Sequence, residues 1–94
     1  MVRFYADWCG VCEKLAPHLH DLAAKNQDRL LFLEVDVEKN EYIVDKYEVL
    51  ELPRMICFKN GAKVSEIFGS KEESYTEWIK KIQEDQDFGG PTDL

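Results

Sequence analysis

Two cysteines separated by two residues, Cys9 and Cys12, lie where a short apolar segment gives way to a helical pattern. Residues 2–6 are apolar and aromatic, which favours a strand. Residues 10–26 carry leucines at helical spacing, which favours a helix with one buried stripe. Two cysteines in the first turn of a helix have Cα atoms roughly 5–6 Å apart, within reach of a disulfide. The segment therefore predicts a strand, a turn that holds a cysteine pair, and a helix.

The rest of the chain continues this alternation. Strands are expected over residues 30–37, 55–58 and 63–68, and helices over residues 39–48 and 70–84. The first of these strands begins as a continuous apolar run, which is typical of a central parallel strand buried on both faces. Asn60-Gly61 predicts a tight hairpin between the last two strands. Ser70 and Glu73 have the spacing of a capping box at the start of the last helix.

The element order is therefore β-α-β-α-β-β-α. The first two strands are joined by a helix, so we expect them to be parallel with a right-handed crossover. The fold class is α/β, a mixed sheet with helices on both faces. The chain of 94 residues is long enough for one domain, expected over residues 1–84. Residues 85–94 are acidic, glycine-rich and without periodicity, and we interpret them as a flexible C-terminal tail.

Charge and composition narrow the classes of function. The formal net charge of −7 argues against a nucleic-acid partner. No apolar run approaches the length that spans a bilayer, so we expect no membrane association. Three cysteines are too few for a disulfide scaffold. We therefore expect a monomer in a reducing compartment, the cytoplasm, with the lumen of the endoplasmic reticulum as the alternative if the chain is a piece of a longer protein.

The first cysteine is expected at the N-terminus of a helix, where unpaired N–H groups and the helix dipole favour a thiolate. Because the thiolate is the nucleophile in disulfide exchange, Cys9 is the candidate reactive group. The competing interpretations are a purely structural disulfide and half of a zinc site, but zinc takes four ligands. Cys57 stands alone in a strand and is expected to fill the core. His18 and His20 are expected at the helix surface with no site to serve, so we predict no metal.

Several stretches resemble the thioredoxin superfamily, which includes thioredoxins and the catalytic domains of protein disulfide isomerases. The matching residues are Phe4-Tyr5-Ala6-Asp7-Trp8-Cys9-Gly10-Val11-Cys12, Lys14-Leu15-Ala16-Pro17, Leu52-Pro53, Phe58-Lys59-Asn60-Gly61 and Gly69. The resemblance covers residues 2–82. It implies a thioredoxin fold and a thiol–disulfide oxidoreductase that reduces or exchanges disulfides of protein substrates, with a reductase or glutathione as electron donor.

The resemblance also implies roles for individual residues. Cys9 would attack the substrate disulfide and Cys12 would resolve the mixed disulfide, so that the redox-active Cys9–Cys12 pair takes the place of a cofactor. Pro53 would be cis and face the cysteines, and the backbone of Leu52 would pair with an extended peptide. Arg54 lies near the groove, where it would favour acidic partners or merely line the end of the strand. The implied substrate-binding set is Trp8, Gly10, Val11, Leu52, Pro53 and Arg54.

Two positions depart from the family pattern. Six residues before its first cysteine the family often has a buried acid, and here Arg3 stands there; a lysine on the neighbouring strand is replaced by Glu34. Burying either charge alone is costly, so we expect a reversed ion pair beneath the active site. Arg3 stays protonated and would stabilise a thiolate. Glu34 is then the acid placed to shuttle a proton to and from the cysteines.

Two questions stay open from the sequence. Val11 lacks the charge of the histidine found in isomerase sites, which favours a reductase. The positive charge of Arg3 favours the isomerase-like activity instead. Reductase and isomerase-like activities therefore both remain possible from the sequence. A second class of function is a binding module that is redox-inactive or weakly active and holds a partner in the groove around Trp8 and Pro53. The presence of both cysteines favours the enzyme.

Overall fold

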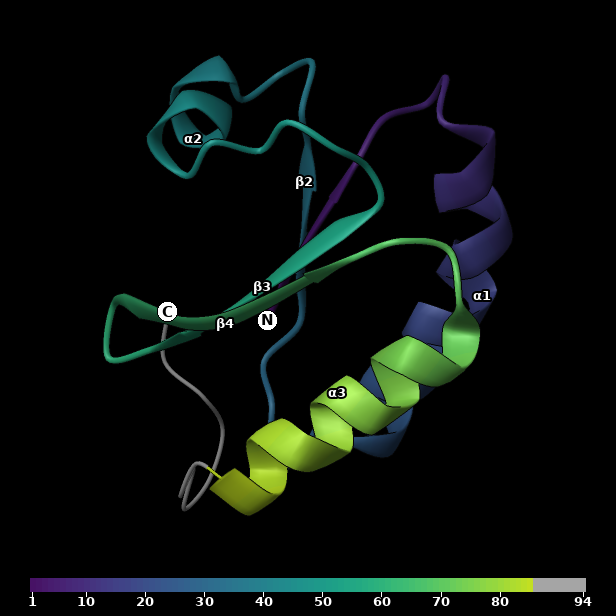
Figure 1. Ribbon diagram of the computed structural model, residues 1–94, viewed down its shortest axis with the longest axis vertical. Helices are drawn as coiled ribbons and strands as arrows, with labels where there is room; N and C mark the ends of the chain where they lie inside the picture. The colour runs from purple at the N-terminus through teal and green to yellow at the C-terminus, as the bar shows by residue number, and fades with distance from the viewer. Residues whose placement is uncertain (86–94) are drawn as a thin grey trace.

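The computed structural model describes residues 1–85, which form a four-stranded mixed sheet flanked by helices (Figure 1). The elements are β1 (Val2–Tyr5), α1 (Gly10–Lys25), β2 (Leu33–Asp36), α2 (Glu41–Lys46), β3 (Arg54–Lys59), β4 (Ala62–Phe68) and α3 (Glu72–Asp85). This order confirms the predicted β-α-β-α-β-β-α arrangement. The predicted tail, residues 85–94, lies outside the described residues except for Asp85, the last residue of α3.

The strand order in the sheet is β2-β1-β3-β4, with β1 parallel to β2 and antiparallel to β3. The prediction that residues 30–37 form a central strand is therefore wrong, because β2 lies at the edge and covers only Leu33–Asp36. Leu30 and Phe32 instead pack under α1 and α3 as part of the connection into β2. The apolar run thus reflects a buried connection, and Leu33 remains 42% exposed at the edge.

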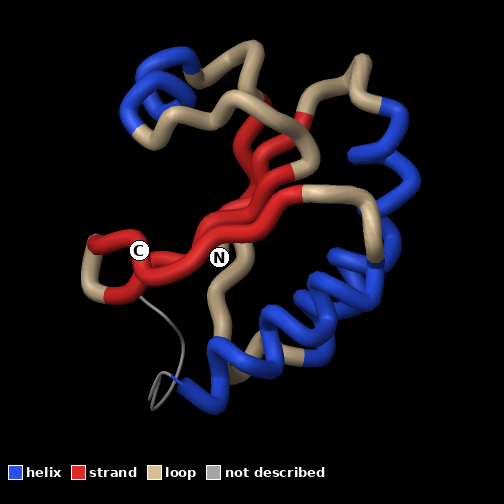
Figure 2. The backbone as a smooth tube through the Cα atoms, in the orientation of Figure 1, coloured by secondary structure: helices blue, strands red, loops and turns tan. Residues whose placement is uncertain are grey.

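The helices lie on both faces of the sheet, as predicted (Figure 2). One core cluster joins leucines of α1 to α3 and to the sheet, and a second joins β1 and β3 to α2. The sequence predicted one apolar stripe on each of two helices: Leu15, Leu19, Leu22 and Ala23 of α1, and Tyr75, Trp78, Ile79 and Ile82 of α3. Six of these side chains are buried, and Ala23 and Trp78 are partly buried. Cys57 is fully buried among them and free, which confirms it as a core residue. Burial raises the pKa of its thiol.

The hairpin between β3 and β4 forms at the predicted Asn60-Gly61 pair. Both residues have positive φ, 54° and 79°, as a tight hairpin with a right-handed twist requires. The predicted capping box is wrong, because α3 begins at Glu72, two residues after Ser70. The preceding residue, Gly69, has φ 123° and donates its N–H to the Pro53 carbonyl at 3.2 Å. This contact holds the chain to the loop before β3 and delays the start of the helix.

None of the helices within residues 1–85 combines the length and the apolar character needed to cross a bilayer.

The fold determines where a functional site can form. The loop after β1 leads directly into α1, and the loop from α2 leads into β3, which pairs with β1. The two loops therefore meet at one end of the sheet, and they carry the cysteine pair and Pro53.

Candidate active site

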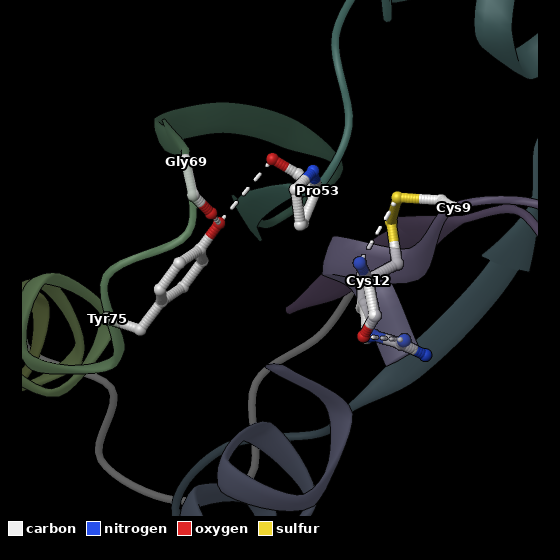
Figure 3. Close-up of a disulfide and its surroundings, with 6 residues drawn as sticks. Cys9, Cys12, Pro53, Gly69 and Tyr75 are labelled. Atoms are coloured by element: carbon white, nitrogen blue, oxygen red, sulfur yellow. Dashed lines mark hydrogen bonds between the residues drawn. A yellow bond between two sulfur atoms is a disulfide. The ribbon is translucent and has the colours of Figure 1, made fainter. Parts of the chain in front are cut away.

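Cys9 and Cys12 form a disulfide at the start of α1, with their Cα atoms 5.2 Å apart (Figure 3). Cys9 is the N-cap residue of the helix, and its Sγ accepts a hydrogen bond of 3.1 Å from the backbone N–H of Cys12. Cys9 is 8% exposed and Cys12 is 1% exposed. The pairing predicted from the spacing is confirmed, and the first cysteine is the more accessible of the two.

This position gives the Cys9 sulfur a chemical advantage once the disulfide is reduced. A thiolate at the N-cap accepts the N–H of Cys12 and lies at the positive end of the helix dipole. Both interactions favour the anion over the thiol and so increase the fraction of nucleophile near neutral pH. The geometry therefore supports nucleophilic attack by Cys9 followed by closure to Cys12.

The disulfide has an apolar floor and an exposed rim. Ala6 packs with both cysteines in a small core cluster, and Leu52 packs against that cluster. The rim is made of residues adjacent to the cysteines in sequence: Trp8 is 68% exposed, Val11 is 45% exposed, and Gly10 is exposed. An aromatic ring held in solvent beside a reactive cysteine is available for contact with a partner.

The loop before β3 supplies the second wall. The Leu52–Pro53 peptide bond is cis, which confirms the expectation taken from the family, and Pro53 lies toward the disulfide in Figure 3. Within residues 1–85, the backbone of Leu52 makes no hydrogen bond. Its N–H and C=O groups remain available to pair with an extended peptide, which is the mode of strand addition.

Tyr75 of α3 fixes this loop in place. Its hydroxyl donates to the Gly69 carbonyl at 2.8 Å and lies 3.5 Å from the Pro53 carbonyl (Figure 3). Burial raises the pKa of Tyr75 to about 12, so the hydroxyl keeps its proton and remains a donor. The sequence marked Tyr75 only as a core residue of the helical stripe. Its hydroxyl also ties α3 to the proline loop.

Arg3 and Glu34 form the predicted ion pair across β1 and β2, where they are register partners. Arg3 is 7% exposed, stacks over the Tyr5 ring at 4.8 Å, and donates from Nη2 to the Cys12 carbonyl at 3.2 Å. The guanidinium is therefore anchored to the backbone of the buried cysteine.

Glu34 has a second partner that the sequence analysis missed. His20 Nε2 lies 3.0 Å from Glu34 Oε2. Partial burial raises the pKa of Glu34, but the hydrogen bonds from His20 and Arg3 outweigh it and hold that pKa below its usual value. His20 is exposed on the helix surface, as predicted, and its ring contacts Glu34 there. The sequence carried a signal, because positions 12, 16 and 20 recur every four residues on one side of a helix.

The Arg54 side chain is paired within the sheet and is largely buried. Its side chain is 12% exposed, its Nη1 lies 2.5 Å from Glu66 Oε2 of β4, and its guanidinium stacks over the Phe68 ring at 5.4 Å. A hydrogen bond from Lys63 and the nearby charge of Arg54 lower the pKa of Glu66. The charge of Arg54 is thus compensated within the sheet.

Among residues 1–85, no group of three or more His, Cys, Asp or Glu side chains is placed to hold a metal.

Known proteins are similar to this chain over most of its length. The sequence matches the Thioredoxin family model over residues 1–81. It is 38% identical over 77 residues to a thioredoxin of Echinococcus granulosus, covering 82% of this chain and 71% of that protein. It is 41% identical over 69 residues to a thioredoxin of Staphylococcus aureus, covering 73% and 66%. The X-ray structure of Fasciola hepatica thioredoxin aligns with a TM-score of 0.80 at 35% identity, covering 85% and 76%.

Proposed function

This chain belongs to the thioredoxin family and is a thiol–disulfide oxidoreductase, a protein-disulfide reductase with a C-x-x-C pair, and from that premise we propose how its residues divide the reaction. The Cys9 thiolate attacks one sulfur of a substrate disulfide, releases the other as a thiolate and forms a mixed disulfide. Cys12, deprotonated, then attacks the Cys9 sulfur. The Cys9–Cys12 disulfide forms, the bond between Cys9 and the substrate breaks, and the substrate leaves with both sulfurs reduced.

The single observation that carries this proposal is the position of Cys9. Its sulfur caps α1, accepts the N–H of Cys12, and closes a disulfide with a partner that is almost fully buried. A buried resolving sulfur is reached only after the accessible sulfur has reacted. The order of attack therefore follows from the exposure of the two cysteines.

Protein substrates bind in an extended conformation across the disulfide in this proposal. The Leu52 backbone pairs with the substrate strand, Pro53 separates that strand from the cysteines, and Trp8 contacts the substrate surface. Gly10 and Val11 complete the rim without adding bulk or charge. Arg54 contributes at most to the end of this wall, because its guanidinium is already paired with Glu66.

The ion pair beneath the site assists the second step. Arg3 holds the Cys12 backbone and favours a thiolate by its charge, and Glu34, ionised beside Arg3, is the carboxylate along which the proton leaves the site. The oxidised pair is returned to the dithiol by a reductase or by glutathione. A dithiol reductase cycles only where its electron donors are maintained, so we assign the protein to a reducing compartment, the cytoplasm.

Reduction of insulin by dithiothreitol tests the proposal. The protein is expected to accelerate precipitation of the reduced insulin chains, and the Cys9→Ser variant is expected to show only the uncatalysed rate. A wild-type rate no higher than that of Cys9→Ser would leave the chain as a binding module of the same fold and would overturn the proposed reaction.

A further inference from the structure

One solvent-facing histidine is connected to the buried cysteine by both a pocket and a chain of polar contacts. A pocket of about 270 Å³ lies beside the start of α1, and both Cys12 and His20 line it. His20 is on the same side of α1 as Cys12, two turns further along, and its side chain is 61% exposed. Its Nε2 lies 3.0 Å from Glu34, which pairs with Arg3.

Resting on the proposed reaction, we propose that His20 accepts the thiol proton of Cys12, through water in this pocket, as Cys12 attacks the mixed disulfide. The Cys12 thiol must lose a proton before it can act as a nucleophile. Arg3, which contacts the Cys12 carbonyl, stays protonated and cannot take it. A water-filled path from Cys12 to an imidazole meets the requirement without a direct contact between them.

The contact with Glu34 prepares the imidazole for this role. The Glu34 carboxylate, which has a lowered pKa, is ionised near neutral pH and has no proton to donate. Nε2 of a neutral His20 must therefore donate to it, which leaves Nδ1 with a free lone pair as the acceptor. The lowered pKa also makes Glu34 itself a weak base. The proton transfer that the sequence analysis assigned to Glu34 is therefore shared: His20 takes the proton, and Glu34 orients the His20 ring.

The charges around the pocket suit an imidazolium product. The ionisable side chains that line it, besides the cysteine, come from β1, the loop after it, α1 and β2: Arg3, Tyr5, Asp7, Glu13, His20 and Glu34. Three of these are carboxylates and one is a permanent cation. A proton gained by His20 is therefore placed beside Glu34 and among compensating negative charge.

The step balances as follows. The Cys12 thiol gives its proton through water to His20 Nδ1, and the electron pair left on Cys12 Sγ forms the bond to Cys9 Sγ. The bond between Cys9 and the substrate sulfur breaks, and that sulfur leaves as a thiolate. The imidazolium then gives its proton to bulk water or to the leaving thiolate, which restores neutral His20.

The test separates the two chemical steps with an aromatic disulfide. Reduced protein mixed with dithiobis(nitrobenzoate) releases one coloured thiolate when Cys9 attacks and a second when Cys12 resolves the mixed disulfide. The leaving thiolate needs no proton, so the second phase reports deprotonation of Cys12. Stopped-flow absorbance would be followed from about pH 6 to pH 10 for wild type, His20→Gln and His18→Gln. Glutamine keeps a hydrogen bond to the neighbouring carboxylate but cannot take a proton at these pH values.

His18 is a matched control on the same helix. Its ring contacts Thr76 at 2.9 Å and Glu72 at 3.3 Å, on the α3 side, and it does not line the pocket beside Cys12. His20→Gln is expected to slow the second phase about tenfold at pH 7, the lower end for a general base because water can still accept the proton. The deficit should shrink as the pH rises, because more of the Cys12 thiol then ionises without a base.

Two results would overturn the inference. One is a second phase in His20→Gln that overlays wild type and His18→Gln throughout the neutral range. The other is a second phase slowed by the same factor at every pH, which would indicate a structural role. Loss of the first phase in wild type would instead refute the proposed function, so the two failures are distinguishable.

Discussion

The guanidinium of Arg3 donates a hydrogen bond of 3.2 Å to the carbonyl oxygen of Cys12. This contact ties a buried positive charge on β1 to the resolving cysteine on α1. The compensating carboxylate, Glu34, pairs with the other terminal nitrogen of the guanidinium, Nη1, and is 44% exposed. The guanidinium contacts the resolving cysteine directly, so its positive charge favours a thiolate in the reduced pair.

Replacing Arg3 with methionine should make the protein more reducing. Loss of the cation destabilises thiolate in the dithiol form, so the reduction potential is expected to fall by about 30 mV, the equivalent of about 1.4 kcal/mol for a two-electron couple. Equilibration with glutathione buffers measures the shift. Arg3→Lys, which keeps the charge, should stay near wild type, and a potential in Arg3→Met equal to or above that of wild type contradicts the prediction.

Replacing Cys12 with serine should trap the substrate. Cys9 remains at the helix N-terminus and still attacks, but nothing resolves the mixed disulfide. Mass spectrometry after incubation with a disulfide-containing protein is expected to show a covalent complex that dithiothreitol releases. The Cys9→Ser variant, which keeps only the buried sulfur, serves as the control. Equal trapping by the two variants would reverse the assigned order of attack.

Replacing Trp8 with alanine should weaken the binding of protein substrates more than the binding of small disulfides. Truncation of an exposed aromatic contact typically costs about 1–2 kcal/mol of binding, which corresponds to roughly a 5- to 30-fold rise in KM for insulin. The rate of the first thiolate release from a small aromatic disulfide should change little. Tyr42→Ala removes another exposed ring, 77% exposed on α2, and should leave both unchanged. An unchanged KM in Trp8→Ala would remove Trp8 from the substrate site.

Replacing Tyr75 with phenylalanine should destabilise the fold and loosen the proline loop. The Gly69 carbonyl loses its 2.8 Å hydrogen bond, and the expected loss in unfolding free energy is about 1–2 kcal/mol. Urea denaturation of the reduced protein measures it. Tyr42→Phe removes a hydroxyl from an exposed ring and should have no measurable effect. A Tyr75→Phe variant as stable as wild type would show that the hydroxyl contributes nothing net.

Stability should also depend on the charge of Glu34 at low pH. Its pKa in the folded protein lies below the usual 4.5. The pairing with Arg3 and His20 therefore contributes fully above about pH 4.5 and is lost as the pH falls through the lower, folded value. The difference in unfolding free energy between wild type and Glu34→Gln is expected to shrink from pH 7 to pH 3. A constant difference over that range, measured by urea denaturation, contradicts the assignment.

The sequence predicted what depends on neighbours along the chain. The cysteine spacing, the leucine stripe and the Asn60-Gly61 hairpin are local patterns, because helix periodicity and turn geometry are set within a few residues. The element order followed from them. The cis bond at Pro53 and the reversed pair of Arg3 and Glu34 came from the family resemblance, which supplies long-range information that local patterns lack.

Tertiary structure decided what depends on segments far apart in sequence. Residues 30–37 were predicted as a central strand, yet β2 covers only Leu33–Asp36 at the edge of the sheet. Leu30 and Phe32 pack in the core of α1 and α3 before the strand begins. Arg54 meets Glu66 only through the pairing of β3 with β4. His20 meets Glu34 only because the first crossover lays α1 beside β2. Periodicity fixes which face a side chain takes, but the packing of whole elements fixes which group it meets.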